Sequence, residues 1–356
     1  MKVLVTGHRG YIGCALVPLL QQAGHEVVGL DSDLYRRCTF SGAMADVVSI
    51  DRDIRDVVAA DLAGGYDAVL HLAGLSNDPL GNLDPDLTIA INHEATVKLG
   101  RLARDAGIPR FVFSSSCSLY GAAGDNFVDE TAEANPVTPY GAAKIMSELA
   151  LTELATDDFS PTFLRNATAY GFSQRVRFDL VVNNLTAWAL TTGRVLMKSD
   201  GTPWRPIVHI EDISRAFLSV MQAPREVVHL QAFNVGRNDE NYRISEIADA
   251  VRELVPGCRI DFEAGAGPDA RCYRVDCSKI VRMVPAFQPQ WTMRAGIVQL
   301  RDAYIAAGLQ QEWFEGPKFS RIAHLRSLLA EHDLDAKLRW SDAAHAHREQ
   351  AERIPA

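Results

Sequence analysis

A tyrosine, a lysine and a run of serines in the first half of the chain have the chemistry of a proton-transfer site. Tyr140 and Lys144 are four residues apart in a stretch that predicts a helix, so they share one face. The lysine charge favours phenolate and lowers the pKa of the tyrosine toward neutral pH. Ser114 to Ser116 end the preceding predicted strand, where a hydroxyl can hydrogen-bond a substrate oxygen. Taken alone, the Tyr/Lys pair is more often part of an amphipathic surface helix.

A glycine-rich turn near the start of the chain has the form of a dinucleotide-binding loop. The segment TGHRGYIG, residues 6–13, lies between a predicted strand and a predicted helix. Its first glycine permits a tight turn, the second lets the backbone approach a pyrophosphate, and the third lets helix and strand pack closely. The free N–H groups of the helix start then face the phosphates. The predicted cofactor contacts here are Gly7, Gly10, Tyr11, Ile12 and Gly13.

Asp31 ends the second predicted strand, about 20 residues after this loop. A carboxylate at that place accepts hydrogen bonds from a ribose 2′-hydroxyl and repels a 2′-phosphate, which favours NAD over NADP. Arg36 and Arg37 follow closely and could soften the rejection of NADP. We place Asp53 and Ile54 against the adenine, with a helix-capping carboxylate as the alternative for Asp53.

Alternating strands and helices must position these residues. Strands are predicted at residues 2–6, 26–31, 47–50, 67–72, 110–115 and 162–165, and helices at residues 11–23, 84–106 and 140–155. This alternation predicts an α/β fold with a Rossmann-type doubly wound parallel sheet over residues 1–170, to which later segments return. Residues 171–310 mix short strands and helices, which predicts a smaller α+β substrate-binding lobe. Residues 311–356 are expected to form a helical C-terminal extension.

Composition excludes several classes of function. The 356 residues include 47% hydrophobic and 23% charged residues, as in ordinary globular proteins, and the net charge is -9. An acidic chain has no global basic field for nucleic acid or an anionic membrane. No apolar stretch approaches the roughly 20 residues of a membrane span, and no signal peptide is evident, so we expect a cytoplasmic protein.

The cysteines and histidines give no metal-binding pattern. Six cysteines are scattered without a C-x-x-C pair, which is typical of reduced thiols in a cytoplasmic enzyme. The late histidines have no convincing ligand spacing and are expected on solvated helix faces; they are His324, His332, His345 and His347. We therefore predict no metal site.

The motifs together resemble the extended short-chain dehydrogenase/reductases, in particular the NAD-dependent epimerase/dehydratase group that acts on nucleotide sugars. The resemblance runs from residue 3 to about residue 276. It rests on the loop above, the Asp31 strand end, HLAG at 71–74, Asn92, SSSCSLYG at 114–121, PYGAAK at 139–144, NNL at 183–185, RPIVHIEDISRA at 205–216 and FNVG at 233–236.

The resemblance implies a role for each matching residue. Ser116 matches the catalytic serine or threonine, Tyr140 the acid/base, and Lys144 its partner, which also holds the nicotinamide ribose. The implied cofactor pocket adds Leu72, Ala73, Gly74, Asn92 and Ser114. The implied substrate contacts are Ser76, Ser116, Cys117, Ser118, Asn166, Thr168, Asn184, Arg205 and Arg271. The usual substrate asparagine of the family is replaced by Thr168, with Asn166 displaced by two positions.

The residues beside the serine narrow the reaction. Dehydratases of the group carry an acidic pair where this chain has Cys117 and Ser118, so 4,6-dehydration loses its acid and base. What remains is epimerisation through a transient keto-sugar, or simple ketone reduction. Gly74-Leu75 resembles the C4 epimerases, and NAD suits a cofactor recycled within one turnover. We therefore predict an NAD-dependent nucleotide-sugar epimerase acting at C4.

Two alternatives stay open at this point. The first is a ketoreductase for nucleotide-linked 4-keto-deoxysugars. The second is a non-catalytic NAD-binding protein on the same fold, although such proteins typically lose the tyrosine or lysine that this chain keeps. The resemblance also implies a homodimer, formed through the helices that carry Asn92 and Tyr140, with a nucleotide-diphosphate sugar as the small-molecule partner.

Overall fold

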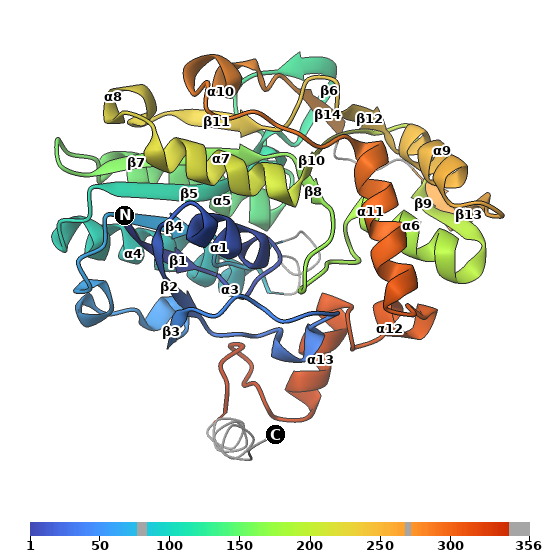
Figure 1. Ribbon diagram of the computed structural model, residues 1–356, viewed down its shortest axis with the longest axis horizontal. Helices are drawn as coiled ribbons and strands as arrows, with labels where there is room; N and C mark the ends of the chain where they lie inside the picture. The colour runs from blue at the N-terminus through green and yellow to red at the C-terminus, as the bar shows by residue number, and fades with distance from the viewer. Residues whose placement is uncertain (77–83, 268–271, 342–356) are drawn as a thin grey trace.

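A seven-stranded parallel sheet forms the larger part of the molecule (Figure 1). The computed structural model describes residues 1–76, 84–267 and 272–341. From one edge to the other the strands are β3 (Val48–Asp51), β2 (Glu26–Asp31), β1 (Lys2–Thr6), β4 (Ala68–His71), β5 (Arg110–Ser116), β7 (Ser160–Asn166) and β11 (Ala232–Val235). The order reverses between β1 and β4, which is the switch point where doubly wound sheets bind ligands. The predicted fold class is confirmed.

Helices cover both faces of this sheet because its strands carry apolar side chains on both sides. One face packs against α1 (Gly13–Gln22), α7 (Ile210–Gln222) and α10 (Ser278–Met283). The other packs against α3 (Pro85–Ile89), α4 (Ala95–Asp105), α5 (Pro139–Glu153) and α13 (Arg321–Ala330). Figure 1 shows α1 and α7 in front of the sheet and α4 behind it. The short helix α8 (Arg225–Val228) precedes β11.

A second apolar core lies beyond the carboxyl ends of the strands. It contains α6 (Val181–Thr192), α9 (Ile244–Leu254), α11 (Met293–Ala306) and α12 (Gln311–Glu315). Three small sheets complete this region: β8 (Thr168–Tyr170) with β10 (Trp204–His209) and β12 (Asn241–Arg243), β9 (Arg194–Ser199) with β13 (Arg259–Gly267), and β6 (Ala122–Val128) with β14 (Cys272–Val275). The pocket described below lies between the two cores.

The predicted helix over residues 84–106 has an irregular centre. A π-helical turn, η4 (Ala90–Glu94), separates α3 from α4 and contains Asn92. Such turns insert one residue into the helical ladder and are frequent at functional sites. Here the turn directs the Asn92 side chain to the backbone of Leu75, where it donates one hydrogen bond and accepts another.

The described part of the C-terminal extension is only partly helical. After α13 the chain turns back, and Leu334 and Trp340 form an isolated antiparallel bridge. The prediction of a solvated His324 is wrong, because its ring is buried and lies beside the backbone oxygens of Leu34 and Pro317. His345 and His347 lie outside the described residues. No helix in the described ranges is long and apolar enough to cross a membrane.

Candidate active site

A pocket of about 720 Å³ opens at the carboxyl ends of the central strands. Its lining residues come from the loops after β4, β5 and β7 and from α5, α6, β9 and β10. Predicted site residues in its wall are Ile12, Leu72, Gly74, Ser76, Ser114, Ser116, Ser118, Tyr140, Lys144, Asn166, Thr168, Asn184 and Arg205. The fold thus brings residues that are up to 193 positions apart, from Ile12 to Arg205, to one cavity.

The glycine loop is held in a form that only glycine allows. Gly7 has φ +75°, and a Cβ there would lie 2.7 Å from the backbone nitrogen of Ala73. A Cβ on Gly13 would lie 2.4 Å from the carbonyl oxygen of Gly7, so helix and loop approach as the sequence motif requires. Tyr11 is buried beside this loop and donates its hydroxyl to the backbone oxygen of Gly171.

Asp31 ends β2 beside this loop. Its carboxylate accepts hydrogen bonds from the backbone nitrogens of Arg9 (2.9 Å) and Asp33 (2.8 Å). Burial and the neighbouring Asp33 charge raise the pKa of Asp31 above its ordinary value. The side chain therefore fixes the loop and stands where the ribose of a bound dinucleotide is expected.

The end of β4 forms the floor of the site. His71 is buried between the hydroxyls of Thr6 and Thr96, each 2.7 Å away. Burial and the Lys144 charge lower the pKa of His71 to about 3, so the ring stays neutral at physiological pH. A Cβ on Gly74 would lie 2.8 Å from Asn92 Oδ1, so a larger residue at position 74 would displace the Asn92 side chain.

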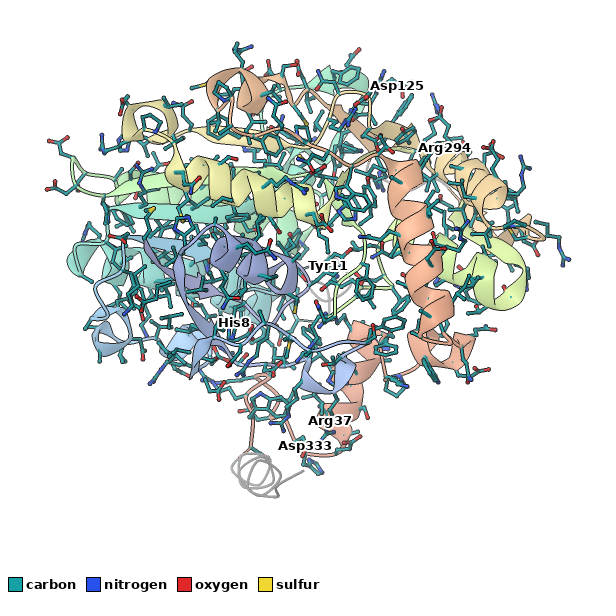
Figure 2. All side chains as sticks on the ribbon, viewed as in Figure 1. His8, Tyr11, Arg37, Asp125, Arg294 and Asp333 are labelled. Carbon is teal, nitrogen blue, oxygen red and sulfur yellow. The ribbon has the colours of Figure 1, made fainter. Side chains whose placement is uncertain are left out.

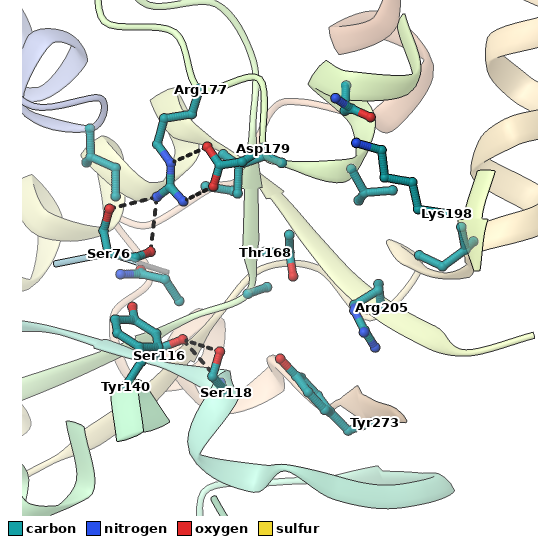
Figure 3. A pocket seen from close by; sticks show the side chains of 18 of the residues that line it. Ser76, Ser116, Ser118, Tyr140, Thr168, Arg177, Asp179, Lys198, Arg205 and Tyr273 are labelled. Atoms are coloured by element: carbon teal, nitrogen blue, oxygen red, sulfur yellow. Dashed lines mark hydrogen bonds and ion pairs between the residues drawn. The ribbon is translucent and has the colours of Figure 1, made fainter. Parts of the chain in front are cut away.

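Tyr140, Lys144 and Ser116 converge in the pocket. Thr138 caps α5 by accepting a hydrogen bond from the Gly141 nitrogen, which places Tyr140 in the first turn and Lys144 one turn later. Lys144 Nζ lies 5.6 Å from the centroid of the Tyr140 ring and donates to the Ser114 carbonyl at 2.6 Å. Ser116 donates its hydroxyl to Ser118 Oγ at 3.1 Å. Figure 3 shows Tyr140, Ser116 and Ser118 on one side of the pocket.

Lys144 is buried, and this sets its acidity. Burial lowers the pKa of Lys144 to about 8, while the negative charge of Glu148, one turn further along α5, acts in the opposite direction. Glu148 is itself held by Arg165, whose Nη2 donates to Oε2 at 2.7 Å, and by Ser115 Oγ at 2.5 Å. Burial therefore brings the lysine near its titration point in the pH range where enzymes work, and the Glu148 charge limits the size of that decrease.

The opposite side of the pocket carries long charged side chains. Arg177 forms a fork with Asp179, and its Nη1 donates to both the hydroxyl (2.9 Å) and the backbone oxygen (3.1 Å) of Ser76. Figure 3 shows this cluster across the cavity from Ser116 and Ser118. Lys198 and Arg205 line a further part of the wall. This side of the pocket therefore presents two positive charges, from Lys198 and Arg205, together with an Arg/Asp ion pair, although the protein as a whole is acidic.

Several predicted contacts stand apart from this pocket. Cys117 does not line it: the thiol is fully buried and donates to the backbone oxygen of Arg165, so the predicted substrate contact is wrong there. The turn after β5 points alternate side chains in opposite directions, and Ser116 and Ser118 take the pocket side. Gly7, Gly10, Tyr11, Gly13, Asp31, Ala73 and Asn92 support the pocket without lining it.

The adenine contacts predicted at Asp53 and Ile54 are likewise absent from the pocket wall. The Asp53 carboxylate caps a short turn by accepting from the Arg55 nitrogen, and the Arg55 guanidinium forks onto it. The capping alternative thus describes the observed contact. Arg271, a predicted phosphate contact, lies outside the described residues.

Among the wall residues that sequence reasoning missed, four have charged or phenolic side chains: Arg177, Asp179, Lys198 and Tyr273. None belongs to a motif quoted for the family resemblance. The one available indication was the spacing of Arg177 and Asp179 just before the NNL motif, but arginine and aspartate two residues apart are usually a surface pair.

Comparisons with known proteins show the family of the chain. A family model described as the NAD dependent epimerase/dehydratase family matches residues 3–236. The chain belongs to this family. A UDP-glucose 4-epimerase of Mycolicibacterium smegmatis is 30% identical over 308 residues, covering 84% of this chain and 97% of its own. The low-salt glycan biosynthesis protein Agl12 of Haloferax volcanii is 27% identical and covers 86% of this chain and 99% of its own.

Solved structures resemble this chain over most of its length. The structure of MoeE5 in complex with UDP-glucose and NAD has a TM-score of 0.75 and 25% identity, and covers 87% of this chain and all of that chain. A UDP-glucose 4-epimerase structure from Thermotoga maritima, at 22% identity and a TM-score of 0.74, shares the fold. The predicted family and the predicted cofactor, NAD, are confirmed.

The residues present fit a bound NAD. The loop is tight, since a Cβ on Gly7 or Gly13 would overlap backbone atoms, and it leads directly into α1, whose first N–H groups can face a pyrophosphate. Near the serines, Asn166 donates to Ser114 Oγ at 3.1 Å, whereas its Oδ1 is buried in the pocket wall with no hydrogen-bond partner. A buried acceptor without a donor is costly, and a ligand amide or hydroxyl at this place would satisfy it.

Proposed function

We propose that this protein is an NAD-dependent nucleotide-sugar epimerase that acts at C4 of the sugar. The observation that carries the proposal is the convergence of Tyr140, Lys144 and Ser116 in one pocket with the cations Lys198 and Arg205. Proton-transfer groups suit a reacting sugar hydroxyl, and arginine or lysine suits a diphosphate that does not react. The mycobacterial relative is named as a UDP-glucose 4-epimerase and is matched over 97% of its length, which supports the choice of C4.

Each side chain has a separate role in the proposed reaction. Tyr140 takes the proton of the sugar hydroxyl as the carbon is oxidised and returns it when the ketone is reduced. The Lys144 cation stabilises the phenolate, and Ser116 donates a hydrogen bond to the same sugar oxygen. Bound NAD supplies a reversible acceptor for the hydride. Inversion requires the keto-sugar to present its other face before it is reduced, so the diphosphate must stay anchored while the sugar turns.

We propose Asn184 and Arg205 as that anchor, with Arg271 as a third group. Asn184 lies in the pocket wall at the start of α6, and its Nδ2 donates to the backbone oxygen of Phe178 at 2.7 Å. Arg205 is buried in the wall and also donates to the backbone oxygen of Trp204. Thr168 and Ser76 border the space between this anchor and Tyr140, and we place the sugar there.

The absence of an acid beside Ser116 argues against dehydration. Ser118 occupies the pocket side of the turn, and Cys117 is buried behind it. Asp179 is a carboxylate in the wall, but both of its oxygens accept hydrogen bonds from Arg177, so it is poorly placed to protonate a leaving hydroxyl group. Incubation with a nucleotide hexose should therefore yield no 4-keto-6-deoxy sugar, whose alkaline absorbance would reveal it.

The direct test supplies UDP-glucose and UDP-galactose separately and follows the anomeric protons by NMR. We expect interconversion without added NAD, because the cofactor is regenerated in each turnover and retained by the protein. Net consumption of a reduced dinucleotide with a 4-keto sugar, and no interconversion, would instead identify a ketoreductase. Binding of NAD with no reaction on any nucleotide sugar would support a non-catalytic protein.

We further propose a cytoplasmic homodimer formed through α4 and α5. Met146 and Leu149 on α5 are apolar and exposed, as residues of a subunit interface are in a single protomer. The six cysteines are all unpaired, which suits a reducing compartment. Sedimentation of the native chain and of Leu149→Glu tests the interface: the variant should shift toward the monomer.

A further inference from the structure

The segment of residues 321–341, here called the C-terminal segment, packs against the loop that follows Asp31. Trp340 donates its indole N–H to the backbone oxygen of Ser32 at 2.6 Å. One ring nitrogen of the buried His324 lies 3.1 Å from the backbone oxygen of Leu34. Leu334 and Leu338 are buried in the same apolar core as β1 and β2. The C-terminal segment therefore packs around the loop that follows Asp31.

The same segment holds the two arginines that follow Asp31. The guanidinium of Arg36 stacks on the Trp340 ring, 3.7 Å from its centroid. Arg37 donates to Glu331 at 2.9 Å and to Asp333 at 2.5 Å. Figure 2 shows Arg37 beside Asp333, away from His8 of the glycine loop. Both arginines that closely follow Asp31 are thus bound to the C-terminal segment.

The other cations near Asp31 are already paired with carboxylates of the sheet edge. Arg9 donates to Asp51 at 2.6 Å and lies 3.6 Å from Asp33. The buried Arg175 donates to the other oxygen of Asp33 at 2.9 Å. With these cations paired, the electrostatic potential around Asp31 is negative as long as Arg36 and Arg37 remain bound to the C-terminal segment.

We propose that the C-terminal segment is a cofactor-selectivity element, which rejects NADP by holding Arg36 and Arg37 away from the ribose 2′ position. Arginine is the side chain that accommodates a 2′-phosphate in dinucleotide-binding folds, since its fork matches phosphate geometry. A free Arg37, only six residues after Asp31, would offer such a fork. Glu331, Asp333 and Trp340 act as positioning residues: they set selectivity through the arginines and touch no cofactor atom.

The experiment titrates full-length, NAD-bound protein with NADH and, separately, with NADPH, and follows the fluorescence change of each reduced nucleotide as it displaces the non-fluorescent NAD. The variant Glu331→Gln/Asp333→Asn removes both ionic partners of Arg37 with little change of shape. We expect its preference for NADH over NADPH to fall about tenfold, since a released arginine gains a charge-assisted hydrogen bond to the 2′-phosphate. Affinity for NADH itself should change less than twofold, which also reports that the variant is folded.

Two comparisons isolate the arginine. Glu312→Gln/Glu315→Gln removes the same number of charges from α12, where neither residue pairs with Arg36 or Arg37 in the described contacts, and should leave the preference unchanged. Adding Arg37→Ala to Glu331→Gln/Asp333→Asn should restore the native preference. A merely structural role of the segment would not respond to that second change.

The proposal fails on either of two results. An unchanged preference in Glu331→Gln/Asp333→Asn would mean that the ion pairs do not restrain Arg37. Weaker NADPH binding by Arg37→Ala in the otherwise native chain would mean that the arginine already serves the phosphate. Because Arg37→Ala is tested in the otherwise native chain, the second result can be obtained even if Glu331→Gln/Asp333→Asn does not fold. Both readouts concern cofactor alone, so they do not depend on the identity of the sugar substrate.

Discussion

The two ends of the proposed ligand site are suited to phosphate in different ways. At the cofactor end, beside the pocket, a tight glycine loop leads into α1, whose first backbone N–H groups can face a pyrophosphate, and the Arg9 side chain of that loop is paired with Asp51. At the sugar-nucleotide end, long side chains such as Lys198 and Arg205 project from β9 and β10. The first end is rigid, because a Cβ on Gly7 or Gly13 would overlap backbone atoms. The second end is formed by side chains, so replacing one side chain would change the shape and charge that a ligand meets.

We place catalysis where the two ends meet. Tyr140 and Lys144 lie on α5, which packs on the rigid sheet, and burial lowers the pKa of Lys144 while the charge of Glu148, paired with Arg165, acts in the opposite direction. In the opposite wall, by contrast, the Lys198 side chain is exposed. The comparison therefore predicts that changes at the cofactor end alter binding of NAD and turnover, while changes at the far end alter mainly the affinity for substrate.

The largest effect is expected at the phenol. Tyr140→Phe should lower turnover by on the order of 10²–10⁴, since it removes the proton acceptor, and should keep bound NAD. Single-turnover measurements of the hydride step test this. Tyr273→Phe removes a phenol from the other side of the same pocket and should retain most of the turnover. Comparable losses in both variants would contradict the assignment.

The rigidity of the glycine loop gives the next effect. Gly13→Ala places a Cβ 2.4 Å from the Gly7 oxygen, whereas Gly10→Ala places one 3.0 Å from the same atom. Overpacking of this kind costs about 1–3 kcal/mol, so NAD affinity should fall roughly ten- to hundredfold in Gly13→Ala. Gly10→Ala should fall less. Equal affinities, measured by titration calorimetry, would show that the loop can relax.

At the substrate end we expect a change of KM with little change of kcat. Arg205→Ala removes a charge-assisted hydrogen bond worth about 1.5–3 kcal/mol, which predicts a roughly ten- to hundredfold increase in KM. Arg271→Ala should act in the same way. Arg243→Ala is the control, because that guanidinium stacks on Trp204 outside the pocket. Normal KM values for Arg205→Ala and Arg271→Ala would place the diphosphate elsewhere.

The smallest effect is a change in the pH profile. Burial lowers the pKa of Lys144 to about 8, so the cation is present below that pH and is lost as the pH rises through it. Turnover should therefore decline above about pH 8. In Lys144→Arg the side chain keeps its charge over this range, so its lower turnover should not show this decline. The same alkaline limb in both proteins would exclude Lys144 as its origin.

Local motifs account for what could be predicted. The glycine loop, the Asp31 strand end and the Tyr140/Lys144 spacing each lie within one strand–turn–helix unit, where backbone geometry follows from neighbouring residues. The same is true of the main strands. Cys117 shows the limit of this reasoning, because the direction of a side chain in the turn after β5 depends on what packs against that turn, here Arg165 on β7.

The sequence by itself determined the family, the doubly wound sheet and the NAD cofactor, and it indicated the proton-transfer groups that we propose, since these depend on residue types at short spacings. Only the tertiary structure decided the substrate wall and the environment of the cofactor ribose. Arg177 meets Ser76 across 101 positions, and Arg37 meets Asp333 across 296. Contacts of that range form only when the two cores pack together, and no local pattern records which distant side chains will then be neighbours.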